Sequence, residues 1–216
     1  VPLSAEEAYY WAWSRQLDLC YFDHPPLIAW MIRFWTMLFG HSVFAARAAA
    51  LVSHFLTVVI MYFFTRRISG NPPAAAWASI LFTLTIFFAV TATAIIPDAA
   101  LFLFWMLTLW FVVEAMRAGR EKYWICVGVA LGLAALAKFH AIFLALAIGL
   151  TLIVSPRQRR HFKSPWFYIC VFLTVAVIMP IFIWNALEGW VTFGFQLSQR
   201  DSLSSWSPIY MIEMIV

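Results

Sequence analysis

Six long apolar runs, each bounded by charged residues or proline, constrain the fold of this chain more than any other feature. They cover residues 43–65, 74–96, 99–116, 123–137, 139–154 and 166–184. The chain is 64% hydrophobic and 11% charged, whereas soluble domains carry about 25% charged residues. A water-soluble globule cannot hide this much apolar surface. We therefore predict an all-α integral membrane protein with a bundle of about six transmembrane helices in residues 43–185.

Lys138 divides an apolar stretch that is too long for one membrane helix. A helix over residues 123–154 would be longer than the roughly 30 Å hydrocarbon core at 1.5 Å per residue. A turn at residues 138–140 is the simpler solution. A lysine at this depth costs a few kcal/mol, so Lys138 either reaches the interface with its long side chain or binds a lipid phosphate as a point charge.

Residues 1–42 precede the apolar runs and are expected to form the first outer loop, with two short helices beside the membrane. Ser4 and Glu7 fit a capping box, which predicts a helix over residues 5–17. A helix of this length is too short to span a bilayer. It is also amphipathic and aromatic, so it should lie along the interface.

Proline positions predict the next segments of the chain. Residues 18–24 are expected to form a loop, because the residue before a proline avoids the helical region. Pro25 and Pro26 suit the start of a second short helix, over residues 27–39. Beyond the bundle, we expect an outer loop over residues 186–208 and the start of a further, truncated helix at 209–216.

Alternating the runs across the membrane separates the charges. Nine of the fourteen Lys and Arg residues fall on one side: Arg66, Arg67, Arg117, Arg120, Lys122, Arg157, Arg159, Arg160 and Lys163. The other side collects Glu6, Glu7, Asp18, Asp23, Asp98, Glu188 and Asp201. The positive-inside rule makes the basic side cytoplasmic, so the acidic side faces the periplasm or the outside. In a membrane protein the positions of the Lys and Arg residues say more than their total, so the net charge of +4 does not indicate a nucleic-acid partner.

Three carboxylates on the acidic side are candidate catalytic groups. Asp98 follows Pro97 at a helix start, where it either stabilises the helix dipole or acts as an acid that faces Glu6 and Glu7. Glu6 and Glu7 lie about 100° apart on a helix, so only one needs to face the site. Glu7 can cap the helix while Glu6 takes part in the chemistry.

Basic and imidazole side chains lie on the same side. Arg47 stands one turn into its run, where it either reaches the outer headgroups or binds a phosphate with two hydrogen bonds. His24 and His140 are either packed side chains or members of the site. Asp23 and His24 could bind a divalent metal, but the sequence offers no third ligand, so no cofactor is assigned.

The block LSAEEAYYWAWSRQLDLCYFDHPPLIAW, residues 3–30, resembles the first outer loop of the polyprenol-linked, GT-C type glycosyltransferases. These include the protein mannosyltransferases and the bacterial lipid A aminoarabinose transferase, and the similarity is greatest to their bacterial family 39 relatives. Further blocks match in the family's order: the Arg47 region, IIPDAALFLFW around Asp98, GLAALAKFHA around Lys138, and IFIWNALEGWVTF from Ile181.

The resemblance implies a GT-C-like helix bundle with a catalytic acid in the first outer loop. That acid usually belongs to an Asp-Glu pair, which is Glu6-Glu7 here, and the family's second acid maps onto Asp98. The aminoarabinose transferase has an acid followed by lysine, linked to metal and phosphate contacts, where this chain has Asp23-His24. Inversion at the sugar carbon is also implied by the resemblance.

These observations lead to a functional hypothesis. A sugar on undecaprenyl or a similar polyprenyl phosphate is the donor, and its phosphate lies near Lys138, Arg47 and His24. Glu6 or Glu7, together with Asp98, deprotonates and orients an acceptor hydroxyl. Substrate binding or loop positioning is expected of Tyr10, Asp23, His140 and Asn185.

The expected setting is the bacterial inner membrane, in which the chain makes several passes among membrane lipids. The acceptor is a lipid, a glycan or a protein. The alternative is a polytopic transporter or lipid flippase, which predicts broken helices that meet near the midplane. Charges that gather at one interface favour the enzyme.

Overall fold

The computed structural model describes residues 2–117 and 119–203, with side chains up to residue 198. The described residues form helices joined by loops and turns, and contain no strand. Its α-helices are α1 (Ala5–Arg15), α2 (Leu27–Phe39), α3 (Val43–Ser69), α4 (Pro72–Leu84), α5 (Ile86–Thr93), α6 (Pro97–Ala115), α7 (Trp124–Ala137), α8 (Ala141–Val154), α9 (Pro165–Leu187) and α10 (Val191–Leu203). Two short 3-10 helices, η1 (Glu121–Tyr123) and η2 (Arg159–Lys163), precede α7 and α9.

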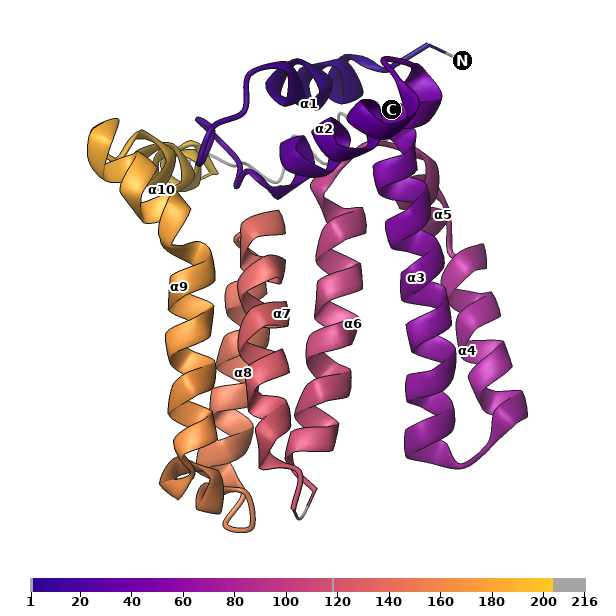
Figure 1. Ribbon diagram of the computed structural model, residues 1–216, viewed down its shortest axis with the longest axis vertical. Coiled ribbons are helices and arrows are strands. Elements are labelled where there is room, and N and C mark those ends of the chain that lie inside the picture. Colours follow the sequence, from indigo (N-terminus) through magenta and orange to yellow (C-terminus); the bar gives the residue numbers. More distant parts are fainter. Residues whose placement is uncertain (1, 118, 204–216) are drawn as a thin grey trace.

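The long helices lie side by side, and the connecting segments divide between two ends (Figure 1). At one end α1 and α2 lie across the bundle, and α10 lies beyond α9; we name this the acidic end. The opposite end holds the α3–α4, α6–α7 and α8–α9 connections. Because these connections and the last turn of α3 carry the nine basic residues grouped above, we name it the basic end. The predicted grouping of these nine basic residues at one end is confirmed, whereas the side chain of Asp201, predicted for the other end, lies outside the described residues.

Of the described helices, three are long and apolar enough to cross a membrane: α3, α6 and α9. The predicted single helix over residues 74–96 is instead two helices, α4 and α5, bent by 71°. Thr85 at the break has an extended backbone and bonds its hydroxyl to the Leu81 carbonyl oxygen at 2.7 Å. The bent pair would be a fourth crossing. Helices α7 and α8 have 14 residues each, so six crossings stays a prediction.

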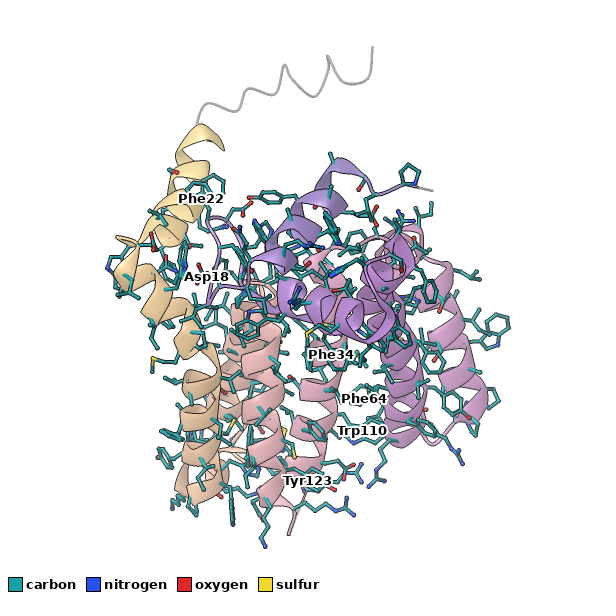
Figure 2. The ribbon with its side chains drawn as sticks, turned by 45° about the horizontal axis from the view of Figure 1, so that its top comes forward. Asp18, Phe22, Phe34, Phe64, Trp110 and Tyr123 are labelled. Carbon is teal, nitrogen blue, oxygen red and sulfur yellow. The ribbon has the colours of Figure 1, made fainter. Side chains whose placement is uncertain are left out.

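Glycine allows α7 to pack closely against α9. A β-carbon on Gly128 would lie 2.5 Å from the carbonyl oxygen of Cys170, and one on Gly132 would lie 2.6 Å from the Val177 side chain. Small residues let membrane helices approach in this way. Between α3 and α6, the rings of Phe64 and Trp110 lie side by side instead, with centroids 6.4 Å apart (Figure 2).

Several local predictions hold. Ser4 and Glu7 form the expected capping box, although α1 ends at Arg15. Helix α2 covers the predicted residues 27–39. The predicted outer loop over 186–208 contains α10, while residues 204–208 and the predicted helix start at 209–216 lie outside the described residues.

Candidate active site at the acidic end

Lys138 and Asp98 form an ion pair that joins two separate parts of the bundle. Pro97 begins α6, since its fixed φ and missing N–H suit the first helical position, and Asp98 follows in the first turn. Lys138 ends α7 with an extended backbone. Its Nζ donates to both carboxylate oxygens of Asp98, at 2.8 and 2.7 Å. An ammonium group has three N–H donors, so Lys138 can donate to Asp98 and to a further anion.

Glu7 and Arg47 form a second pair, which anchors α1 to α3. Arg47 donates from Nε and Nη2 to the two Glu7 oxygens, both at 2.8 Å. The Glu7 carboxylate is 4% exposed and also accepts from the backbone N–H groups of Ser4 and Ile95. The hydrogen bond from Arg47 is the largest influence that lowers the pKa of Glu7, to about 2. Glu7 is therefore ionised and bound to Arg47 at neutral pH.

Glu6 points differently from its neighbour. It is exposed, and its Oε1 accepts a long hydrogen bond of 3.5 Å from the Tyr10 hydroxyl. Tyr10 is buried, and burial raises its pKa, followed by the negative charges of Glu6, Asp23 and Asp98. The Tyr10 hydroxyl thus lies within electrostatic reach of three acids from separate segments of the chain.

A polar cavity of about 250 Å³ lies beside these groups. It is lined by Asp23, His24, Pro25, Lys138, Phe139, His140, Phe195 and Gln196. The His24 Nδ1 lies 3.2 Å from Asp23 Oδ2 without the alignment of a hydrogen bond, so this buried atom has no hydrogen-bond partner among the described residues. The cavity therefore combines cationic and imidazole groups with an unsatisfied buried nitrogen.

An apolar cavity of about 430 Å³ adjoins the polar one. The two share Phe139 and Gln196 in their walls. The apolar walls come from α7, α8, α9 and α10, and include Leu131, Ala145, Ile178, Ile181 and Phe182. A molecule with a polar head and an apolar chain would find both environments side by side.

Asn185 holds the α9–α10 junction in place. Its side chain is fully buried, donates to the Ile181 carbonyl oxygen at 2.9 Å and accepts from the Thr192 N–H at 3.1 Å. The Thr192 hydroxyl in turn donates to the Tyr21 carbonyl oxygen at 3.0 Å. This geometry favours loop positioning over direct substrate contact, the two roles expected for Asn185.

The described residues contain no group of three His, Cys, Asp or Glu side chains that could hold a metal ion. Asp23 and His24 remain a pair of potential ligands, as in the sequence. Protein metal sites commonly use three or four side chains, so the pair by itself does not fit a resident metal.

Comparison with known proteins identifies the family. Residues 23–184 match the family model described as dolichyl-phosphate-mannose-protein mannosyltransferase, which covers well over half of the chain. The chain belongs to this family. The match includes Asp23, His24, Asp98 and Lys138, and so most of the polar cavity.

The names of two curated relatives of this mannosyltransferase-family chain refer to lipids. The lipid A galacturonosyltransferase RgtD of Rhizobium johnstonii is 26% identical over 94% of the chain and 42% of its own length. The undecaprenyl phosphate-alpha-4-amino-4-deoxy-L-arabinose arabinosyl transferase of Pseudomonas savastanoi pv. phaseolicola is 30% identical over 79% of the chain and 32% of its own length. The chain thus spans less than half the length of these relatives.

The fold also has a solved counterpart. The crystal structure of ArnT from Cupriavidus metallidurans in the apo state superimposes with a TM-score of 0.72, at 20% identity, over 86% of the chain and 38% of ArnT. The mannosyltransferase-family chain is therefore an all-α integral membrane protein with a GT-C fold, as predicted.

The sequence did not predict the part that α10 plays in the site of this family member. Phe195 and Gln196 of α10 line the polar cavity, and the Gln196 Nε2 donates to the Asp23 carbonyl oxygen at 2.7 Å. The neighbouring ring of Phe22 lies against α10 (Figure 2), with its centroid 4.7 Å from that of Phe195. The spacing of the apolar residues in α10 is the one sequence pattern that could have predicted this helix. The contact itself joins Gln196 to Asp23, which lies over 170 residues earlier in the chain.

Proposed function

We propose that this protein transfers a sugar from a polyprenyl-phosphate donor to a hydroxyl group of a lipid, glycan or protein acceptor. Membership of the mannosyltransferase family supports sugar transfer. The relatives named for undecaprenyl phosphate and for lipid A support a lipid-linked donor and a lipid or glycan acceptor. The acidic end faces the periplasm in this proposal, because the positive-inside rule assigns the basic end to the cytoplasm.

The shared wall of the two cavities is the observation that carries the proposal. The polyprenyl chain lies in the apolar cavity between α8 and α9, and the phosphate enters the polar cavity beyond Phe139 and Gln196. Lys138, with a donor left over from its bond to Asp98, binds the phosphate together with His24 or His140. Arg47 contributes to the site indirectly by holding Glu7 and α1.

The chemistry is a single displacement at the anomeric carbon. The acceptor oxygen forms the new bond to that carbon while the bond to the phosphate oxygen breaks, and polyprenyl phosphate leaves. Lys138 stabilises the negative charge that develops on the leaving phosphate. The acceptor proton moves to a carboxylate, either Glu6 or Asp98. Glu7 is a weaker choice for this role, because its 4% exposed carboxylate is bound by Arg47 and by two backbone N–H groups, whereas the Asp98 side chain is 17% exposed.

The transporter alternative has less support. Helices α4 and α5 form a broken pair, as some transporters have. However, residues 72–96 contain no charged side chain, so none of the charged side chains that gather at the acidic end comes from this broken pair. The relatives described above are named as transferases.

Sugar transfer by the natural-length protein in proteoliposomes, with labelled undecaprenyl-phosphate sugar, tests the proposal. Ala145→Trp fills the apolar cavity, and a misfit of this kind costs about 1–3 kcal/mol, so KM for the lipid donor should rise roughly tenfold. Leu150→Trp is the control, since Leu150 lies on the same helix, is exposed, and does not line the cavity. Equal donor KM values for the two variants would contradict the assignment, and absence of transfer by the unaltered protein would contradict the function.

A further inference from the structure

A second polar cavity lies at the basic end, remote from the proposed active site. It has a volume of about 320 Å³ and is built by η1, η2 and the start of α9. Its walls include Glu121, Arg160, His161, Lys163, Ser164 and Trp166. None of these residues takes part in the proposed transfer reaction, so the cavity needs an explanation of its own.

His161 in the cavity wall is buried and incompletely satisfied. It is 1% exposed, and the indole N–H of Trp124 donates to its Nδ1 at 3.2 Å. An indole nitrogen can only donate, so Nδ1 is the acceptor and a neutral imidazole carries its proton on Nε2. Burial, followed by the charge of Arg160, lowers the pKa of His161 and favours this neutral form. Nε2 has no hydrogen-bond partner among the described residues, which leaves a donor suited to an anion.

The N-terminus of α9 opens at the same cavity. Ser164 is the N-cap residue, and its side chain makes no capping hydrogen bond. The first turn of this 23-residue helix contains no acidic residue. Pro165 has no N–H, and the Phe167 N–H donates to the Ser164 carbonyl oxygen at 3.2 Å, so the Trp166 N–H and the helix dipole are what this end offers to a phosphate or another anion.

The charges of the basic end are unevenly compensated. The Glu114 carboxylate pairs with Arg67, Arg117 and Arg120, at 2.9, 3.6 and 2.6 Å. In contrast, no carboxylate of the described residues lies within ion-pair distance of Arg160 or Lys163. Glu121 also lines the cavity, so the walls carry two positive charges against one negative charge.

An apolar stripe continues from the cavity along the outside of α9. Pro165 belongs to the cavity wall, and Ile169, Phe172 and Met179 follow it at the spacing of one helix face. Their side chains are 37%, 70% and 41% exposed. An anion that carries a hydrocarbon chain therefore fits this place better than a free anion does.

We propose that the cavity binds the phosphate of an anionic phospholipid from the surrounding bilayer. The phosphate accepts hydrogen bonds from His161 Nε2–H and from the Trp166 N–H, between the charges of Arg160 and Lys163. One acyl chain lies along the Pro165–Met179 side of α9. This lipid site is separate from the donor site and does not depend on the proposed function.

Native mass spectrometry of the natural-length protein, released from nanodiscs, tests the proposal. Nanodiscs of phosphatidylcholine with and without phosphatidylglycerol supply the lipids. The unaltered protein should retain phosphatidylglycerol in preference to phosphatidylcholine. Removing two cations near an anionic lipid should weaken retention roughly tenfold or more, so Arg160→Gln with Lys163→Gln should lose the preference.

A matched control separates a site from a diffuse charge effect. Arg157→Gln with Arg159→Gln removes the same charge from exposed residues of the same connection that do not line the cavity, and it should retain phosphatidylglycerol. Equal losses in both double variants would overturn the proposal. His161→Gln keeps a donor and an acceptor and should retain more lipid than His161→Leu. Competition by inorganic phosphate as strong as that by phosphatidylglycerol would also overturn it, by showing a free-anion site.

Discussion

Lys138 Nζ lies 2.8 and 2.7 Å from the two carboxylate oxygens of Asp98, and this pair links the start of α6 to the turn between α7 and α8. Both side chains remain partly exposed, at 24% and 17%. A purely structural pair and a substrate-binding pair can share this geometry. The two roles predict different rates of sugar transfer when the charge of Lys138 is removed.

Lys138→Met should abolish most sugar transfer while the protein remains in the membrane at its usual level. Removing one group that stabilises transition-state charge typically lowers kcat by about 100-fold to 1,000-fold. Single-turnover transfer from a labelled polyprenyl-phosphate sugar measures this loss. Lys122→Met, at the basic end, should transfer sugar at the normal rate. Normal transfer by Lys138→Met would remove Lys138 from the mechanism.

Glu6 and Glu7 should respond differently to the same substitution. Glu6→Gln removes an exposed carboxylate near Tyr10 and should lower transfer about 100-fold, as expected for loss of a general base, with little change in melting temperature. Glu7→Gln replaces a buried carboxylate that bonds Arg47 and should lower the melting temperature. Transfer assays and thermal unfolding in detergent, carried out in parallel, separate the two effects. If Glu6→Gln transfers normally, Asp98→Asn becomes the test of the remaining base.

Acid should weaken the contact between α1 and α3. The pKa of Glu7 is lowered from 4.5 to about 2, so the folded protein binds this proton less tightly than the unfolded chain does. The resulting stabilisation is fully present above pH 4.5 and is lost as the pH falls toward about 2. Melting temperatures from pH 6 downward should therefore converge for unaltered protein and Glu7→Gln. A constant difference across this range would exclude Glu7 as the titrating group.

Gly128→Ala should destabilise the bundle, because the new methyl would lie 2.5 Å from the Cys170 carbonyl oxygen and α9 would have to move. Overpacking of this kind costs about 1–3 kcal/mol. Gly149→Ala is the matched control, since Gly149 lies in α8 and its β-carbon would meet nothing within 4 Å. That change should be neutral or stabilising by up to about 1 kcal/mol. Thermal unfolding of both variants measures the contrast, and similar melting temperatures would contradict the close packing of α7 on α9.

Local signals predicted much of the fold. The capping box at Ser4 and the prolines before Leu27 placed α1 and α2, because caps and proline act within one helical turn. Lys138 placed the turn between α7 and α8, since a charge in a long apolar stretch must be brought to an interface or paired. The break at Thr85 was not predicted, because the residues on both sides are apolar and neither glycine nor proline marks it.

Pairings between distant residues were only partly foreseen. Sequence reasoning placed Asp98, Lys138 and Asp23 at one membrane depth, and the structure brings Asp98 and Lys138 into contact. The bond between Glu7 and Arg47 depends on how α1 lies across α3, which no local pattern specifies. The same holds for Gln196, whose position depends on the bend between α9 and α10.

The contact between Gln196 and the Asp23 carbonyl oxygen also has a consequence for biosynthesis. The ribosome makes Asp23 long before Gln196, and membrane insertion proceeds from the first helices onward. Asp98 and Lys138 can pair once α6 and α7 are in place, whereas one wall of the polar cavity is supplied only after α9 and α10 have emerged. A nascent chain that stalls within α9 therefore carries Asp23, Asp98 and Lys138 but lacks the wall of the polar cavity that Phe195 and Gln196 supply.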